Sequence, residues 1–184
     1  MASNFNSVVN RASFAVTSLL YGLRAAGRAD VIYAYHPPLT VGVVAAVLKL
    51  VRRRPVVYDI QDMWPDTLAA TGMISSQKVL GAVAVVCGWV YRAADRIVVL
   101  SPGFKRTLEQ RGVPAAKVEV IRNWADEDSL RASRASLPER FPGPDRFRVV
   151  FAGNLGKAQA IDSLLEVARR LHARDSRVSF VFIG

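Results

Sequence analysis

The segment Val56–Asp66, with the sequence VVYDIQDMWPD, decides the fold of this chain. It begins as a short apolar run rich in β-branched residues, which is typical of a buried strand. It then breaks into carboxylates, an indole and a proline. In open α/β sheets, ligands gather beyond the carboxyl ends of the strands. The segment therefore predicts a buried strand over 55–60 that ends at a candidate site.

Helical and strand patterns alternate on both sides of this segment. The spacing of apolar residues predicts helices over 5–23, 39–51, 76–94 and 102–111, and strands over 31–35, 55–60, 96–100 and 117–121. This alternation predicts an α/β fold with a parallel sheet and helices on both of its faces.

The composition changes after the fourth strand. Residues 122–146 contain three prolines, a glycine and several charges without apolar periodicity, which is typical of a linker. A second α/β unit follows, with strands predicted over 147–152 and 178–183 and a helix over 161–173. We therefore predict an N-terminal domain over 1–125, a linker over 126–146 and the start of a second domain over 147–184. One βαβ unit is too small to bury a core of its own.

Charge and composition limit the possible partners. The chain has 184 residues, of which 51% are hydrophobic and 22% charged, and its formal net charge is +10. Such a charge favours an anionic partner: a nucleotide diphosphate, an anionic membrane or a nucleic acid. Nucleic acid is disfavoured because the basic residues are scattered and do not alternate with aromatic residues. The basic run Arg52–Arg54 is either a solvated helix end or a contact for anionic lipid.

The one cysteine and the longest apolar run exclude two further features. Cys87 is alone, so no internal disulfide forms, and a small buried side chain in a reducing compartment fits best. Val79–Tyr91 is shorter than the roughly 20 residues that a membrane-spanning helix needs.

The main candidate site follows the strand that opens this section. Its polar and aromatic residues can hydrogen-bond a sugar or its acceptor, and they are Asp59, Asp62, Trp64 and Asp66. The alternative is a helix start, with Asp62 or Asp66 as the N-cap and Pro65 in the first turn. Both interpretations are compatible with each other.

Three other segments are weaker candidates. His36, after the first strand, can serve as an acid, a base or a phosphate partner, or it is structural. Phe151–Gln159 contains a strand end, a glycine turn and a helix start, and is either an anion cradle or an ordinary tight turn. It matches neither the dinucleotide fingerprint nor the common phosphate-binding loop. Ile121–Asp126 is either a hinge that touches ligand or an ordinary loop.

Four segments in order carry a resemblance to a known family: Tyr58–Asp66, Ile97–Phe104, Val120–Asp126 and Phe151–Gln159. They resemble the family-4 retaining glycosyltransferases of GT-B fold, and most of all the branch of bacterial fucosamine-type sugar transferases. The resemblance implies two Rossmann-like domains across a cleft, with the acceptor on the N-terminal side and the nucleotide-sugar donor on the C-terminal side. It also implies that no metal or other cofactor is needed, because positive groups and helix N-termini stabilise the leaving diphosphate.

The resemblance assigns roles to residues of this chain. It implies that the catalytic residues are Asp59 and Asp62. It implies that the donor diphosphate is bound by Gly153, Asn154, Lys157 and Gln159. Ser101 and Asn123 match two later strand-end motifs of the family. We expect them to line the cleft together with His36 and Trp64, which the sequence places after strands. Many members carry arginine at the position of Asn154 and lysine at that of Gln159, whereas the fucosamine-type branch has uncharged residues there.

The implied function is that of a hexosyltransferase. It would transfer a sugar, with retention, from a nucleotide-diphosphate donor to a lipid-linked or polysaccharide acceptor in cell-surface polysaccharide biosynthesis. The expected location is cytoplasmic, with peripheral contact at the inner face of the plasma membrane. The family's first strand would precede Met1 and its donor-binding glutamate pair would follow Gly184, so we expect a truncated member with an incomplete first domain. The alternative is an inactive α/β module that binds a membrane or a partner protein.

Overall fold

The structure is a computed structural model that describes residues 2–128, 141, 143, 145–156, 159–175 and 177–184. The chain forms two compact units, Met1–Trp124 and Ala125–Gly184, and each is described by itself. The predicted linker, 126–146, lies largely outside the described residues.

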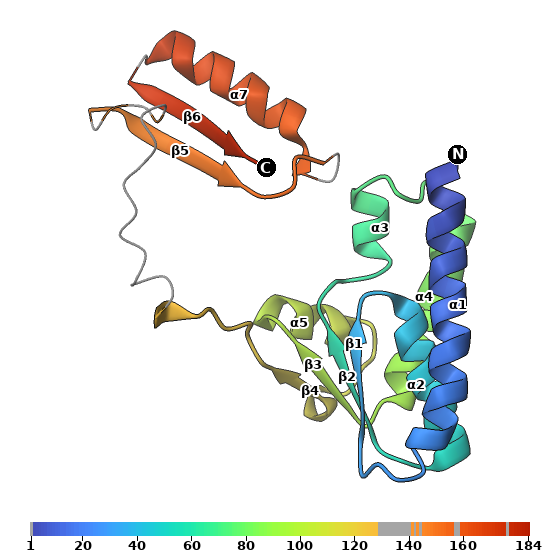
Figure 1. Ribbon diagram of the computed structural model, residues 1–184. Helices are drawn as coiled ribbons and strands as arrows, with labels where there is room; N and C mark the ends of the chain where they lie inside the picture. The colour runs from blue at the N-terminus through green and yellow to red at the C-terminus, as the bar shows by residue number, and fades with distance from the viewer. Residues whose placement is uncertain (1, 129–140, 142, 144, 157–158, 176) are drawn as a thin grey trace. The chain divides into compact units, whose positions relative to one another are not determined.

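The first unit alternates helices and strands, as the sequence predicts. In chain order its elements are α1 (Ala2–Ala25), β1 (Ile32–His36), α2 (Leu39–Arg52), β2 (Val56–Ile60), α3 (Asp66–Ala70), α4 (Gln77–Ala93), β3 (Arg96–Val99), α5 (Pro102–Gln110), the 3₁₀ turn η1 (Ala115–Lys117) and β4 (Val118–Val120) (Figure 1). Each helix and strand predicted for this unit is present, with ends that differ by three residues or fewer.

The sequence leaves open whether Asp59–Asp66 is a site, a helix start or both, and the short helix α3 answers part of this question. A helix does start there, with Asp66 as its first residue and Pro65 just before it. The expected cap is wrong, because Pro65 itself occupies the N-cap position and no side chain caps the helix. The carboxylate of Asp62 accepts hydrogen bonds from two side chains instead.

The four strands form one parallel sheet in the order β1-β2-β3-β4. Their register places Ala34, Tyr58, Ile97 and Val118 in one row across the sheet. The next row is formed by Tyr35, Asp59, Val98 and Glu119. Because side chains alternate along a strand, the two rows point to opposite faces.

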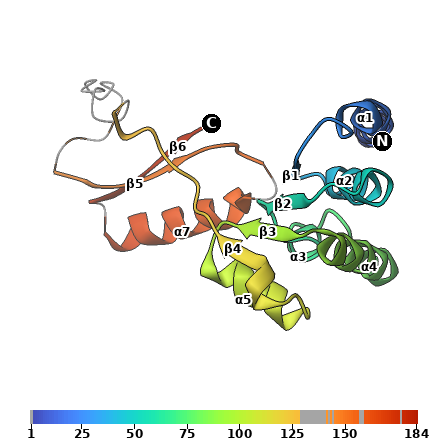
Figure 2. The same ribbon diagram turned by 90° about the horizontal axis from the view of Figure 1, so that it is seen from below.

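The connecting helices cover one face of this sheet, so the expectation of helices on both faces is wrong for the described residues. The first row is buried, together with side chains from α2, α4 and α5 such as Ala45, Val90 and Leu108. Figure 2 shows α1, α2 and α4 end-on in a row beside the strands. Tyr33 and Tyr35 on the opposite face are 60% and 54% exposed. The reason is the sequential strand order, since right-handed crossovers that always step the same way place every helix on the same side.

Tyr58 is the largest fully buried side chain of the core, at 1% exposure. Its ring lies against Gly42 of α2, where an added Cβ would lie 2.8 Å from Tyr58 Cε2 and 2.8 Å from Val90 Cγ1. Glycine therefore allows the close approach of α2, β2 and α4. Burial raises the pKa of the Tyr58 hydroxyl well above its ordinary value.

His36, at the end of β1, belongs to the same core, with 2% of its surface exposed. Its ring packs edge-on against Tyr58 and Trp64, with centroid distances of 5.9 Å and 5.3 Å. Burial lowers the pKa of His36 to about 4, although the carboxylate of Asp62 acts in the opposite direction. The imidazole is therefore neutral near pH 7.

The second unit is a single βαβ unit, as predicted. It contains β5 (Phe147–Ala152), α7 (Ile161–Arg174) and β6 (Val178–Ile183), and the two strands pair in parallel. No described side chain of this unit is fully buried, and Phe147 is 69% exposed. This agrees with the expectation that one βαβ unit has too few apolar contacts for a core.

Across the part of the chain that the structure describes, none of the helices combines the length and the apolar character needed to cross a membrane.

The contact at Gly42 gives a first prediction. Gly42→Ala should lower the free energy of unfolding by about 1–3 kcal/mol, because the new methyl group overpacks the Tyr58 ring. Gly81 is the matched control, since it is also helical but has nothing within 4 Å of an added Cβ. Gly81→Ala should raise stability by up to about 1 kcal/mol. Urea unfolding of both variants checks this, and equal effects would contradict the packing argument.

His36 gives a second prediction. Its pKa is lowered in the folded protein, so between about pH 6.5 and pH 4 the unfolded state binds the proton more readily. Its contribution to stability is complete above pH 6.5 and is lost as the pH falls, by roughly 1–3 kcal/mol. Replacing it by the non-titrating His36→Gln should therefore flatten the dependence of unfolding free energy on pH between 5 and 7.

The control for this measurement is His172→Gln, which removes the exposed histidine of α7. That variant should retain the slope of the unmodified protein. An equal slope in His36→Gln and the unmodified protein would show that His36 does not titrate differently on folding.

Candidate functional site

Polar side chains follow three neighbouring strands at the carboxyl edge of the first sheet. Gln61 and Asp62 follow β2, Ser101 comes two residues after β3, and Asn123 lies just beyond β4. Since the strands are parallel, these segments emerge at the same edge, where ligands bind in open α/β folds. The structure therefore brings together the strand-end residues that the sequence singles out.

Asp59 anchors a chain of hydrogen bonds along this edge. Its carboxylate accepts a bond from the Tyr33 hydroxyl and another from Gln61 Nε2 at 2.6 Å. The amide oxygen of Gln61 in turn accepts a bond from Asn123 Nδ2 at 3.3 Å. The bond to Asp59 is the main cause that raises the pKa of Tyr33 to about 12, so Tyr33 stays protonated and donates. Asp59 is 6% exposed, so in this structure it orients Gln61 rather than facing solvent.

Asp62 is the more accessible of the two predicted carboxylates. Its two oxygens accept hydrogen bonds from Trp64 Nε1 at 3.2 Å and from Thr67 Oγ1 at 2.6 Å. These bonds fix the carboxylate against the start of α3. A carboxylate has about four acceptor positions, so Asp62 can still accept a bond from a ligand hydroxyl.

The other predicted cleft residues take different positions. Ser101 is the N-cap of α5, where its hydroxyl accepts a bond from the Phe104 N–H at 3.2 Å. The prediction that His36 lines the cleft is wrong, because apolar burial places its ring in the core beneath Trp64. Asn123 is exposed and takes part in the edge network through Gln61.

A cavity of about 480 Å³ lies beside Asp62 and Trp64. Its walls are mostly apolar and come from α1, the β1–α2 turn and the α3 region: Asn10, Phe14, Pro37, Pro38, Asp62, Trp64, Thr67, Leu68 and Met73. Such a volume and a few convergent polar groups in an apolar wall are typical of small-molecule sites. We call this space the Trp64 cavity.

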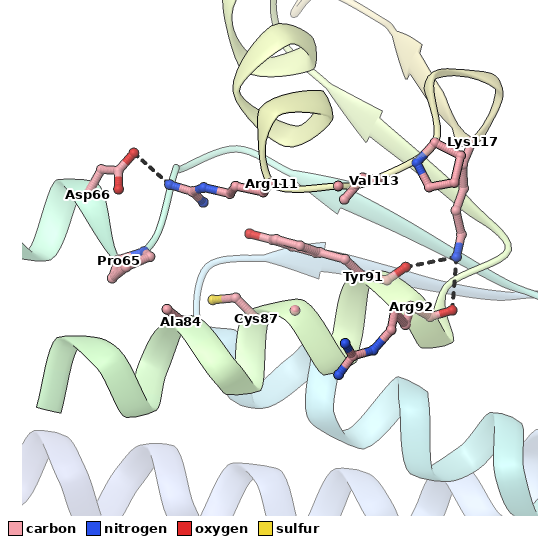
Figure 3. Close-up of a pocket in the computed structure, with 12 residues that line it drawn as sticks. Pro65, Asp66, Ala84, Cys87, Tyr91, Arg92, Arg111, Val113 and Lys117 are labelled. Carbon is pink, nitrogen blue, oxygen red and sulfur yellow. Dashed lines mark hydrogen bonds and ion pairs between the residues drawn. The ribbon is translucent and has the colours of Figure 1, made fainter. Parts of the chain in front are cut away.

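Pro65 and Asp66, which follow Trp64 in the chain, border a second cavity. It has a volume of about 620 Å³ and lies between α4 and the turn that follows α5. Figure 3 shows Tyr91 and Cys87 projecting from α4 toward this space, with Arg111 reaching along it to Asp66. Lys117 donates bonds to the carbonyls of Tyr91 and Arg92 at 2.8 Å and 2.9 Å. We call this space the Tyr91 cavity.

The predicted donor-binding turn lies in the second unit. Gly153 has φ +151, a conformation that suits glycine, and its N–H donates to the Ile183 carbonyl at 2.9 Å. A Cβ added to Gly156 would lie 3.0 Å from Gln159 Oε1 and 3.5 Å from Asn154 Nδ2. The two amide side chains therefore both lie beside Gly156. Lys157 lies outside the described residues.

Sequence reasoning missed four residues that hold the site together: Tyr33, Gln61, Thr67 and Arg111. Two of them had a local signal. Gln61 lies between the two singled-out carboxylates, and Thr67 is the first hydroxyl after Asp62. Tyr33 and Arg111 are 26 and 45 residues from their carboxylate partners, so only the fold reveals those contacts.

Two curated bacterial relatives match almost the whole chain. One is the "Probable glycosyltransferase WbjE" of Pseudomonas aeruginosa, which is 22% identical over 99% of this chain and 47% of its own length. The other is the "Putative colanic acid biosynthesis glycosyl transferase WcaI" of Escherichia coli K12, 26% identical over 99% of this chain and 46% of its own length. The chain thus spans about half the length of the curated relatives it matches.

Solved structures share the fold. The crystal structure of Anabaena Alr3699/HepE in complex with UDP matches 90% of this chain and 51% of that chain, with a TM-score of 0.54 and 18% identity. The same protein in complex with UDP-glucose gives a TM-score of 0.51 at 19% identity over the same shares. The α/β fold with parallel sheets therefore matches GT-B-like structures.

The family match covers most of the first unit and the whole candidate edge. Residues 7–124 match the family described as glycosyl transferase 4-like domain. This range includes Asp59, Asp62 and Asn123, and it spans the walls of the Trp64 cavity. The resemblance in the sequence to family-4 glycosyltransferases is confirmed at this level, and the chain belongs to the glycosyl transferase 4-like family.

Proposed function

We propose that the protein takes part in transferring a sugar, with retention, from a nucleotide-diphosphate donor to a lipid-linked or saccharide acceptor. The process would be cell-surface polysaccharide biosynthesis, by analogy with the biosynthetic relative of E. coli. The observation that carries the proposal is the Trp64 cavity, which lies at the carboxyl edge of the sheet within the segment that matches the family.

The walls of the Trp64 cavity support an acceptor with an apolar part. Phe14 and Met73 are 54% and 62% exposed, although both line the cavity. Apolar side chains left in water favour an apolar ligand, because burying them releases free energy of roughly 25 cal/mol per Å². Asp62 at the same wall offers a carboxylate to a hydroxyl. A sugar attached to a lipid matches both features.

Asp62 and Asp59 take different roles in this proposal. Asp62 accepts a hydrogen bond from the acceptor hydroxyl and orients it for attack, which is a positioning effect. Asp59 acts through Gln61, because Asp59 is only 6% exposed and its carboxylate is bonded to Tyr33 and Gln61. No metal enters this scheme. The charge of the leaving diphosphate is stabilised by backbone N–H groups and positive side chains.

The donor side rests on the second unit. The relatives solved with UDP and UDP-glucose support a nucleotide-sugar donor. The turn at Gly153, with Asn154 and Gln159 beside it, joins β5 to α7 and is the proposed phosphate contact, together with Lys157. The uncharged residues at Asn154 and Gln159 support a place near the fucosamine-type branch.

A basic end of the first unit supports peripheral contact with the inner face of the membrane. Arg24, Arg28, Arg52 and Arg53 are exposed where α1 and α2 end. A bond of 3.0 Å from Arg54 Nη2 to the Gly27 carbonyl joins these two ends. The apolar side chain of Leu50 is 68% exposed nearby on α2. Basic residues around exposed apolar ones favour an anionic lipid surface.

The role of Asp62 gives a third prediction. With nucleotide sugars as donors and a polyprenyl-diphosphate-linked sugar as acceptor, Asp62→Asn should lower the transfer rate about 10²-fold by misplacing the acceptor. The control is Asp30→Asn. Asp30 is an exposed carboxylate just before β1, at the amino ends of the strands, so this variant should keep the transfer rate of the unmodified protein. Product formation is followed by mass spectrometry.

Two outcomes would overturn the proposal. No binding or transfer with any nucleotide sugar would remove the enzyme assignment and favour a non-catalytic module. Full transfer by Asp62→Asn would retain an enzyme but move its acceptor site away from the Trp64 cavity.

The basic end gives a fourth prediction. Replacing Arg28 and Arg52 by glutamine should weaken binding to vesicles rich in phosphatidylglycerol about 30-fold, since each charge near the surface contributes about 1 kcal/mol. Replacing Arg169 and Arg170 removes the same charge from exposed positions on α7. The fraction of protein that sediments with the vesicles measures binding. An equal fall of this fraction in both double variants would show a general effect of charge rather than binding through a defined surface.

A further inference from the structure

Arg111, just after α5, bonds to the loop that carries Asp62 and Trp64. Its Nη1 donates to the Trp64 carbonyl at 2.8 Å, and its Nη2 donates to Asp66 Oδ2 at 2.6 Å. The two acceptors lie on either side of Pro65. The planar guanidinium has donors at a fixed spacing, so it holds both acceptors in one relative position.

The backbone of Arg111 is held in place by hydrogen bonds and by buried neighbours. Arg111 is the C-cap of α5, and its N–H bonds to the carbonyls of that helix. Leu108 and Val113 on either side of it are 0% and 8% exposed, and the Val113 N–H bonds to the Leu108 carbonyl at 3.0 Å. The guanidinium therefore extends from a fixed part of the core, along the wall of the Tyr91 cavity (Figure 3).

The loop itself forms part of two cavities. Pro65 and Asp66 line the Tyr91 cavity, whereas Asp62, Trp64 and Thr67 line the Trp64 cavity. Met63 and Leu68 hold the loop from the core side, at 6% and 3% exposure. Between these two anchors Arg111 bonds to the backbone carbonyl of Trp64, whereas the indole packs on His36 and bonds to Asp62.

The energy of this contact points to positioning rather than to stability. Asp66 has 59% of its side chain exposed and Arg111 has 25%. Water and salt screen such a pair, so its net contribution to folding is small. A displacement of about 1 Å in a site can nevertheless lower a reaction rate about 10²-fold.

We propose that Arg111 is a positioning residue. It sets the place of Trp64 and Asp62 in the Trp64 cavity, and it does so from the opposite side of the loop. The inference rests on the proposed function for its catalytic consequence. It acts through the backbone of Trp64 and touches neither substrate. Its removal should loosen the indole and weaken acceptor binding while the fold stays intact.

The test uses Arg111→Met in the protein labelled with 5-fluorotryptophan. The chain has three tryptophans, so ¹⁹F NMR gives three resonances, with Trp89 and Trp124 as internal controls. The Trp64 resonance should shift by a few tenths of a ppm and broaden, and its solvent isotope shift should rise. The other two resonances should stay in place. Arg111→Lys keeps the positive charge but lacks the two guanidinium donors at a fixed spacing. It should therefore give an intermediate shift of the Trp64 resonance.

Arg96→Met is the matched control. Arg96 also donates a guanidinium bond to a distant backbone carbonyl, that of Ala116 at 2.7 Å, but it lies away from the loop. Both variants should have melting temperatures within a few degrees of each other. An unchanged Trp64 resonance in Arg111→Met, or an equal change in Arg96→Met, would overturn the inference. If Arg111→Met does not fold, Arg111→Lys and Asp66→Ala answer the same question.

Kinetics supply a second readout where transfer is detected. Arg111→Met should raise KM for the acceptor about 3–10-fold and leave KM for the donor unchanged. Equal changes in both constants would contradict a role in the acceptor cavity. If no transfer is detected in the unmodified protein, the proposed function fails, and the ¹⁹F result still decides whether Arg111 positions Trp64.

Discussion

The parallel pairing of β2 with both β1 and β3 is the constraint on which the rest of the first unit depends. It places Val56, Tyr58 and Ile60 on one face, at 2%, 1% and 1% exposure. The alternation that buries these three leaves Asp59 on the other face, where Tyr33 of β1 reaches it. The carboxylate network is thus a direct consequence of which residues the core requires.

The loop after β2 converts this arrangement into a site. It leaves the sheet at Gln61 and returns to the core at Met63 and Leu68. The residues between these anchors line two cavities, and the Trp64 carbonyl among them accepts a hydrogen bond from Arg111, just after α5. The site is therefore assembled from several strands and helices on one edge, which is typical of α/β proteins.

The sequence predicts the elements well because their signals are local. Apolar spacing and turn residues locate the helices and strands; the helix predicted over 102–111, for example, is α5, Pro102–Gln110. The placement of helices on one face depends on strand order, which local patterns do not encode. For the same reason the sequence does not show that Tyr58 and Trp64 enclose His36 in the folded chain, and its position after a strand predicts a cleft residue instead. The partners of Asp59 and Asp62 mix local and distant residues, so only the nearby ones carried a signal.

The open face of the sheet has a consequence for the colloidal behaviour of this protein. Tyr33, Tyr35 and Ile121 leave apolar surface in water at 60%, 54% and 59% exposure, and β1 is at the edge of the sheet that the structure describes. Such surfaces attract other copies of a chain. A net charge of +10 opposes that attraction by mutual repulsion. Salt shortens the reach of this repulsion from about 8 Å at physiological strength to about 3 Å at 1 M. The balance between a dispersed and a self-associating sample is thus set by ionic strength, through side chains exposed on the face of the sheet that the helices leave uncovered.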